Sequence, residues 1–255
     1  MNIIVCLKQT FDTEEKIVIE NGAISEDGVE FIINPYDEYA VEEAIKLRDE
    51  VGGEVTLVTV GPDRAETALR TALAMGADRA VIVNDEELFG DQFTTAKVLA
   101  TVLKDREYDL IIAGNMAVDN GSGQIGPRLA EELNIPQVTT ITKIDVDGNK
   151  VTCERDVEGD LEIIETTLPV LVTAQQGLNE PRYPSLPGIM KAKKKPMERL
   201  DASDLNLDPA AVQSPTVVEE IYLPAKKDAG KILSGDLADQ VKELVQLLHN
   251  EAKVV

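Results

Sequence analysis

LIIAGNMAVDNGSGQIGPRLAEEL, residues 110–133, is the stretch that decides the predicted fold. Residues 110–113 form a short apolar run typical of a buried strand, and residues 124–133 carry apolar positions at helical spacing. Between them lies a loop rich in glycine and asparagine, residues 114–123. A buried strand, a loop and a helix form the repeating unit of an open α/β sheet, in which ligands bind beyond the carboxyl ends of the strands.

The same alternation continues on the N-terminal side of this unit. The elements predicted there are a strand at 2–7, a helix at 36–50, a strand at 55–60, a helix at 62–75, a strand at 80–83 and a helix at 91–103. Such alternation predicts parallel strands joined by right-handed crossovers. A hairpin is expected at 16–24, because Asn21-Gly22 favours a tight turn between two short strands.

Beyond Pro136 the sequence becomes rich in strands, which we expect to extend or flank the sheet in antiparallel fashion. These strands are predicted at 138–144, 151–156, 161–165 and 170–174. The predicted fold class is therefore α/β, with a doubly wound, mainly parallel sheet, added antiparallel strands and a C-terminal arm that ends in a helix.

Residues 191–255 are predicted to form this arm, and residues 1–190 the α/β domain. Residues 197–227 contain several prolines in polar surroundings, a composition that does not favour an independent core. Apolar residues from Ile232 to Leu248 then recur at helical spacing. We expect them to form an amphipathic helix that packs on a partner surface.

The charge excludes nucleic acid as a partner, because 25 basic and 47 acidic residues give a formal charge of -22 that repels phosphate backbones and anionic lipids. Cys6 and Cys153 lie in apolar stretches without metal-site spacing, so we expect a reduced compartment, no disulfide and no metal. The chain begins directly with a strand and has no run of membrane-spanning length. A cytoplasmic protein without direct membrane insertion is expected.

The glycine-rich loop at 114–126 has two interpretations. Its glycines allow the backbone to approach a phosphate, the following helix offers free amides, and Ser122 and Gln124 can add hydrogen bonds. It is neither a Walker loop nor a G-x-G-x-x-G fingerprint, so an ordinary turn that precedes a capped helix stays open as the alternative.

Four segments of the chain resemble the electron transfer flavoprotein beta subunit family. They are DNGSGQIGPRL at 119–129, NPYDEYAVEEAIKLRD at 34–49, TALAMGADRA at 71–80 and LNEPRYPSLPGIMKAKKK at 178–195. Their order and spacing cover most of the chain, which makes chance agreement improbable. The resemblance implies a nucleotide-binding domain like those of universal stress proteins and the adenine-nucleotide alpha-hydrolase group, with AMP buried in it.

The resemblance also implies which residues contact the nucleotide. Carried onto this chain, they are Cys6, Asn34, Val60, Asn115, Asp119, Asn120, Gly121, Ser122, Gly123, Gln124 and Gly126. Cys6 and Val60 provide an apolar floor for a base, and the amide of Asn34 suits a base or ribose edge. From the residues alone, an Asx turn in which Asn34 caps the next helix is the favoured interpretation, and only the resemblance places Asn34 at the nucleotide.

By the same resemblance, residues 178–195 form the loop that docks partner dehydrogenases. Leu186 is the expected apolar anchor, with Lys191 and Lys194 steering an acidic partner surface. A solvated, proline-rich linker is the alternative. Asp156 stands where the resemblance places an acidic residue, usually a glutamate, that faces the flavin domain of the large subunit. The alternative interpretation is that Asp156 is a surface carboxylate with no partner-binding role. His249, the lone histidine, has no triad or metal-site partner nearby in the sequence.

The function implied is that of the beta subunit in a heterodimer, an electron carrier rather than an enzyme with catalytic residues of its own. FAD is held mainly by the alpha subunit, which receives electrons from acyl-CoA dehydrogenases and passes them to a quinone reductase. The alternative is an electron-bifurcating homologue whose second FAD, in this subunit, accepts hydride from NADH. Such homologues commonly read DGDT where this chain has Asp119-Asn120-Gly121-Ser122, which favours AMP. A free-standing, stress-type ATP-binding protein is disfavoured by the long apolar arm.

Overall fold

The computed structural model describes residues 1–227 and 229–255. Within these residues the chain divides into two compact units. The larger contains Met1–Val18 and Ser25–Glu219, and the smaller contains Ile19–Ile24 and Glu220–Val255.

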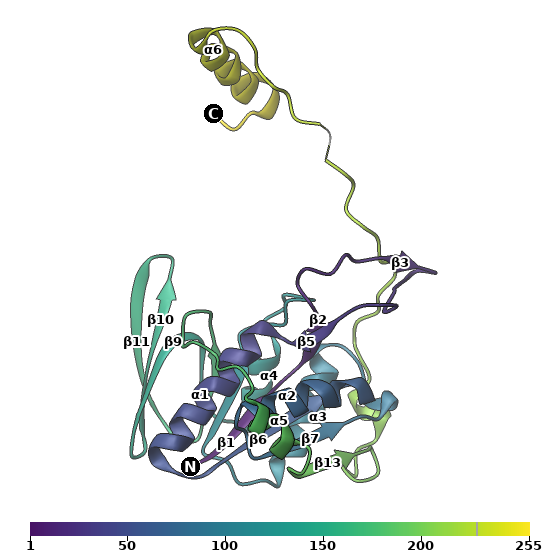
Figure 1. Cartoon of the computed structure of the whole chain (residues 1–255), viewed down its shortest axis with the longest axis vertical. Helices are drawn as coiled ribbons and strands as arrows, with labels where there is room; N and C mark the ends of the chain where they lie inside the picture. The colour runs from purple at the N-terminus through teal and green to yellow at the C-terminus, as the bar shows by residue number, and fades with distance from the viewer. Residues whose placement is uncertain (228) are drawn as a thin grey trace. The chain divides into compact units, whose positions relative to one another are not determined.

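The larger unit is built on one central sheet, in which the described residues contribute nine strands (Figure 1). In spatial order these are β11 (Asp160–Thr167), β10 (Lys150–Val157), β9 (Gln137–Asp147), β12 (Val170–Ala174), β8 (Leu110–Gly114), β1 (Asn2–Cys6), β6 (Glu54–Val60), β7 (Arg79–Val83) and β13 (Met197–Leu200). All neighbours from β9 to β13 pair in parallel, whereas β10 pairs antiparallel with both β9 and β11. The predicted α/β class with a mainly parallel sheet and added antiparallel strands is confirmed. The expectation that all four strands beyond Pro136 are antiparallel additions is wrong for β12, which lies inside the sheet and pairs in parallel with both β9 and β8. Its run of apolar residues fits this buried position between two strands.

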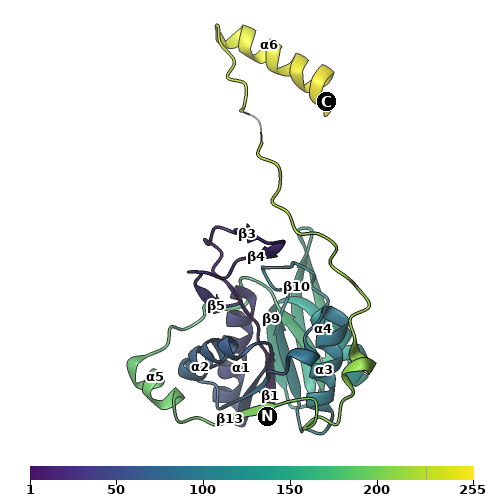
Figure 2. The same ribbon diagram turned by 90° about the vertical axis from the view of Figure 1, so that its right-hand side faces the viewer.

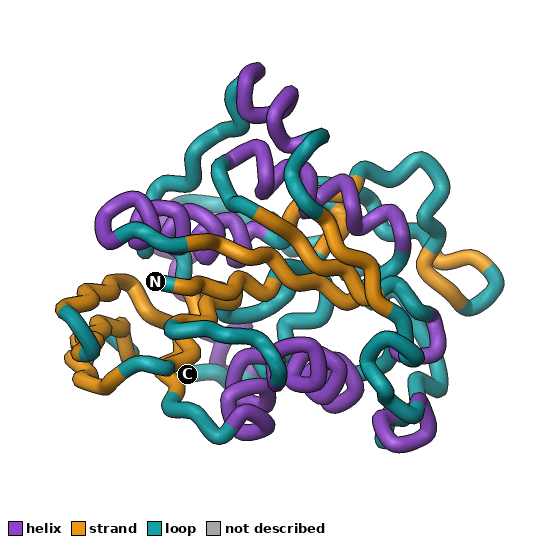
Figure 3. The backbone as a smooth tube through the Cα atoms, turned by 90° about the horizontal axis from the view of Figure 1, so that it is seen from below, coloured by secondary structure: helices purple, strands orange, loops and turns teal. Residues whose placement is uncertain are grey.

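Helices cover both faces of this sheet (Figure 2). The helices α1 (Pro35–Val51) and α2 (Glu66–Met75) pack on one face, whereas α3 (Gln92–Lys104) and α4 (Ile125–Leu133) pack on the other. Figure 3 shows the strands as a layer between the helices. The doubly wound arrangement is therefore confirmed, and it explains why the central strands are apolar along their whole length rather than at alternate positions.

Two hydrophobic clusters hold these layers together. Ile3, Val5 and Ile112 point into the cluster below α1 and α2, and Ile4 and Ile111 point into the cluster below α3 and α4. Successive side chains of one strand thus point into opposite clusters, because side chains alternate between the two faces of a pleated strand. The helices contribute many alanines, which let them lie close to the sheet without aromatic filling.

Two elements in the C-terminal third were not predicted from the sequence. Residues 186–192 form a short helix, α5 (Leu186–Ala192), which packs against α2. Residues 197–200, which the sequence analysis placed in the arm, form β13 and pair with β7 at the edge of the sheet. Pro196 donates no backbone hydrogen bond, but its carbonyl accepts one from Ala80, and this bond starts the pairing.

The smaller unit contains a hairpin and a helix. The strands β3 (Ile19–Glu20) and β4 (Ala23–Ile24) pair antiparallel across Asn21 and Gly22, both with positive φ, so the predicted hairpin is confirmed. The helix α6 (Leu237–Leu247) begins at Asp236, whose side chain accepts a hydrogen bond from the Asp239 amide. The predicted amphipathic helix is confirmed from Leu237 onward, whereas the residues from Ile232 to Asp236 precede it. Leu237, Val241, Leu244 and Val245 are exposed.

No helix in the described part of the chain has the length and hydrophobicity needed to span a membrane. Cys6 and Cys153 are both buried free thiols.

Candidate nucleotide-binding site

A cavity of about 230 Å³ lies at the carboxyl edge of the sheet. From β1 the chain moves to β6 and β7 on one side, and it then crosses to β8 and β12 on the other. The loops after β1 and β8 therefore diverge, and the space between them is the switch point at which open α/β sheets bind ligands. Residues after β1, β6 and β8 line the cavity, together with the segments that begin α3 and α4.

The floor of the cavity is apolar. Cys6 and Val60 line it, as predicted, and so do Leu99 and Ala113. Burial, together with the nearby charge of Asp37, raises the pKa of Cys6 to about 12, so the thiol is neutral. It therefore acts as a small apolar contact and not as a thiolate.

Asp37, in the first turn of α1, joins two of the lining loops. Its Oδ2 accepts a hydrogen bond of 2.7 Å from the amide of Lys8 after β1, and its Oδ1 accepts one of 3.0 Å from the amide of Gly114 at the end of β8. Burial raises the pKa of Asp37 to about 7, although these hydrogen bonds oppose the shift. Gly114 has no room for a side chain, because a Cβ there would collide with Asp37 and Tyr36.

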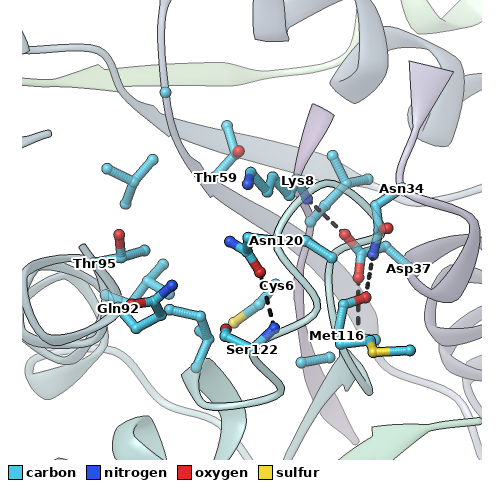
Figure 4. Close-up of a pocket in the computed structure, with 18 of the residues that line it drawn as sticks. Cys6, Lys8, Asn34, Asp37, Thr59, Gln92, Thr95, Met116, Asn120 and Ser122 are labelled. Carbon is cyan, nitrogen blue, oxygen red and sulfur yellow. Dashed lines mark hydrogen bonds between the residues drawn. The ribbon is translucent and has the colours of Figure 1, made fainter. Parts of the chain in front are cut away.

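Asn34 holds the glycine-rich loop by both ends of its amide (Figure 4). Its Nδ2 donates to the Met116 carbonyl at 2.9 Å, and its Oδ1 accepts from the Val118 amide at 3.0 Å. Its side chain does not cap α1, so the alternative of an Asx turn is wrong. The residue lines the cavity, as predicted, but its first role is to fix the shape of the loop.

The glycine-rich loop closes one side of the cavity. Asn120 accepts a hydrogen bond from the Ser122 amide at 3.1 Å, and Gly121 and Gly123 have positive φ values of 61° and 60°. The amides of Gly123 and Gln124 donate no hydrogen bond to any part of the chain that the structure describes. They lie just before α4, whose N-terminus carries a partial positive charge, so they are suited to an anionic group.

The predicted loop residues divide into three groups. Asn115, Asn120, Ser122, Gly123 and Gln124 line the cavity. Asp119 is half-exposed at the rim and pairs with Lys8, whereas Gly121 forms the turn beside it. Gly126 lies beneath the site, where a Cβ would collide with Thr173 of β12, so it allows α4 to approach the sheet.

Sequence reasoning missed several lining residues. Lys8, Asp37 and Thr59 follow or support the strands, and Gln92 and Thr95 come from the start of α3 (Figure 4). The position of Lys8 just after a strand could have indicated that it lines the site, because side chains at the carboxyl edge of a parallel sheet converge on the switch point. Their partners, however, are remote in the sequence.

The predicted docking residues do not line this cavity. Leu186 is 80% exposed at the start of α5, and Lys191 and Lys194 are also exposed. Tyr183 and Met190 add further exposed apolar surface next to Leu186. The short helix α5 therefore presents Leu186, Met190 and Lys191, whereas Tyr183 precedes it and Lys194 follows it.

Asp156 lies near the end of β10, where its Oδ1 accepts a hydrogen bond of 3.1 Å from the Gly159 amide. This contact belongs to the turn between β10 and β11 and leaves the second carboxylate oxygen exposed to solvent. His249 is exposed, and its Nδ1 lies 2.9 Å from the carbonyl of Val255.

The fold and the cavity define a doubly wound α/β protein with a cavity at its switch point, where such folds bind ligands. Comparison with known proteins makes the assignment more specific. The electron transfer flavoprotein domain family matches residues 21–205. The chain belongs to the electron transfer flavoprotein family, and a relative 60% identical to it is named a beta subunit.

Three relatives illustrate the range of similarity. Electron transfer flavoprotein subunit beta of Bacillus subtilis (strain 168) is 60% identical over 100% of both chains. The subunit beta of Thermoanaerobacterium thermosaccharolyticum is 43% identical over 98% of each chain. The caffeyl-CoA reductase-Etf complex subunit CarD of Acetobacterium woodii is 38% identical, covering 94% of this chain and 95% of the relative.

Proposed function

We propose that this chain is the beta subunit of a heterodimeric electron transfer flavoprotein and that it holds AMP in the cavity at the switch point. The observation that carries the proposal is the loop held by Asn34, with the unpaired amides of Gly123 and Gln124 beside the start of α4. These groups fit a phosphate, and the apolar floor of Cys6 and Val60 fits a base. The chain itself contributes no catalytic residue.

Electron transfer is then the work of FAD held mainly by the alpha subunit, and this chain contributes binding and positioning. Electrons pass from acyl-CoA dehydrogenases to a quinone reductase. Leu186, with Lys191 and Lys194, docks the dehydrogenase, and Asp156 faces the flavin domain of the alpha subunit. The exposed positions of all four residues support these roles. We place the complex in the cytoplasm.

The second candidate is an electron-bifurcating subunit with a second FAD in the same cavity. Its support is the similarity to a subunit of a caffeyl-CoA reductase-Etf complex. The loop sequence Asp119-Asn120-Gly121-Ser122 favours AMP.

Nucleotide content of the heterodimer tests both candidates. The chain is co-produced with its alpha subunit, the complex is denatured, and the released nucleotides are separated and quantified. We expect one FAD and one AMP per heterodimer. Two FAD and no AMP would favour the bifurcating candidate, and a heterodimer with no nucleotide besides the FAD of the alpha subunit would overturn the assignment of the cavity.

A further inference from the structure

Few charged side chains line the cavity. Among its lining residues, all of them within the described part of the chain, Lys8 is the single basic side chain, and Asp37 and Asp91 are the acids. The whole protein carries a formal charge of -22. A phosphate that enters this site therefore meets an unfavourable field from the protein, and a nearby cation is needed to offset it.

Lys8 is held in place by its backbone, and its side chain is partly exposed. Its amide donates to the buried carboxylate of Asp37, which positions the residue directly after β1. Its side chain extends from there towards Thr59 and Asn120 (Figure 4). Because the anchored atom is the backbone nitrogen, the ammonium can change partners without any change in the sheet.

The present partner of the ammonium is Asp119 on the glycine-rich loop. The Nζ of Lys8 lies 2.6 Å from Oδ2 of Asp119, and the two side chains are 44% and 38% exposed. An exposed ion pair of this kind contributes little, because water and salt screen it. A terminal phosphate carries nearly two negative charges near neutral pH and is the stronger partner for a lysine.

We propose that Lys8 is the phosphate-binding cation of the nucleotide site and that it exchanges Asp119 for the phosphate when the nucleotide binds. Lys8 and the amides of Gly123 and Gln124 then contact the phosphate together, and Asp119 competes for the ammonium in the empty site. This inference rests on the proposed nucleotide function and adds to it the residue that distinguishes a nucleotide from a nucleoside.

The test compares AMP with adenosine, because the two ligands differ only in the phosphate. Calorimetric titration of the full-length protein, freed of bound nucleotide, gives the ratio of the two affinities for each variant. In Lys8→Met we expect this preference for AMP to fall about tenfold, whereas Lys8→Arg retains most of it. In Asp119→Asn, which removes the competitor, we expect the preference to rise.

Lys150→Met is the matched control. Lys150 forms an equally short ion pair, 2.6 Å from Glu165, but it lies on β10 and does not line the cavity. Its loss should leave the preference for AMP unchanged. If Lys8→Met leaves the preference for AMP over adenosine unchanged, Lys8 does not bind the phosphate, but the proposed nucleotide site is unaffected. Failure of the unsubstituted protein to bind AMP overturns the proposed function and this inference with it.

Discussion

Asp37 is the residue that links the cavity to the fold. One buried carboxylate accepts amide hydrogen bonds from the ends of two adjacent strands, β1 and β8, and thereby fixes the loops that follow them. Desolvation favours the neutral carboxyl, whereas the amide donors favour the carboxylate, and the balance raises the pKa to about 7. The site therefore contains a group that titrates near neutral pH.

A comparison of the protein with Asp37→Asn across pH tests this balance. The native state binds the proton more tightly than the unfolded chain, so the contribution of Asp37 to the free energy of unfolding is largest below the ordinary pKa of 3.8. It declines as the pH rises and is lost above about 7. Urea denaturation of both proteins at several pH values should show the difference in unfolding free energy changing over this interval. The raised pKa of Asp37 is contradicted if the difference in unfolding free energy is independent of pH, or if the carboxyl carbon NMR signal of Asp37 titrates near pH 4.

At the scale of elements, α5 and α2 cap each other. Arg70 of α2 donates to the carbonyls of Ala192 and Lys195 at 2.8 and 3.2 Å. In return, the ammonium of Lys195 donates to the carbonyls of Leu73, in the last turn of α2, and Ala77, just beyond it. Carbonyls in the last turn of a helix lack partners inside that helix, and these contacts reach Leu73 of α2 and Ala192 of α5. The segment that presents Leu186 is thereby held against the domain.

Arg70→Met removes one half of this reciprocal contact while keeping the length of the side chain. Each hydrogen bond from a charged donor contributes about 1.5–3 kcal/mol, and Arg70 donates two of them to this segment. Hydrogen exchange of the α5 amides (Leu186–Ala192) should become faster, and the affinity for the dehydrogenase that we propose docks at Leu186 should fall.

Lys194→Met is the control for this prediction. It removes an equal charge from the same segment, but no side-chain contact of Lys194 is found within the described residues. We expect it to leave the exchange of α5 unchanged. Equal exchange rates in the Arg70→Met variant and the unsubstituted protein would show that packing alone holds α5.

At the scale of the whole molecule, apolar surface gathers at the C-terminus. In α6 the side chains of Leu237, Val241, Leu244 and Val245 are between 47% and 76% exposed, and they recur along one face at helical spacing. A stripe of this kind on a protein with a formal charge of -22 is suited to burial against another chain.

Val241→Asp places a charge in the centre of that stripe, and Gln246→Asp places the same charge away from it. Because a buried carboxylate without a partner is costly, we expect Val241→Asp to weaken the heterodimer by about tenfold or more, with little effect from Gln246→Asp. Sedimentation of each complex over a dilution series gives the dissociation constants. Equal weakening by both variants would attribute the effect to added charge and not to the stripe.

Much of the fold could be predicted because its signals are local. The apolar run at 110–113 and the turn at Asn21-Gly22 each specify their own backbone conformation, and both structures were confirmed. The strand β13 could not be predicted, because its residues, Met197–Leu200, carry no strong strand pattern. They form a strand only because β7, more than a hundred residues earlier, offers an unpaired edge.

The sequence by itself determined the α/β class, the place of the ligand loop and, through four motifs, the family. Only the tertiary structure decided which side chains complete the cavity. Asp37 meets amides 29 and 77 residues away, and Lys8 meets Asp119 at a separation of 111 residues. Contacts at such separations leave no periodic or neighbouring pattern in the chain, since they arise only when the parallel strands bring their carboxyl ends to one edge of the sheet.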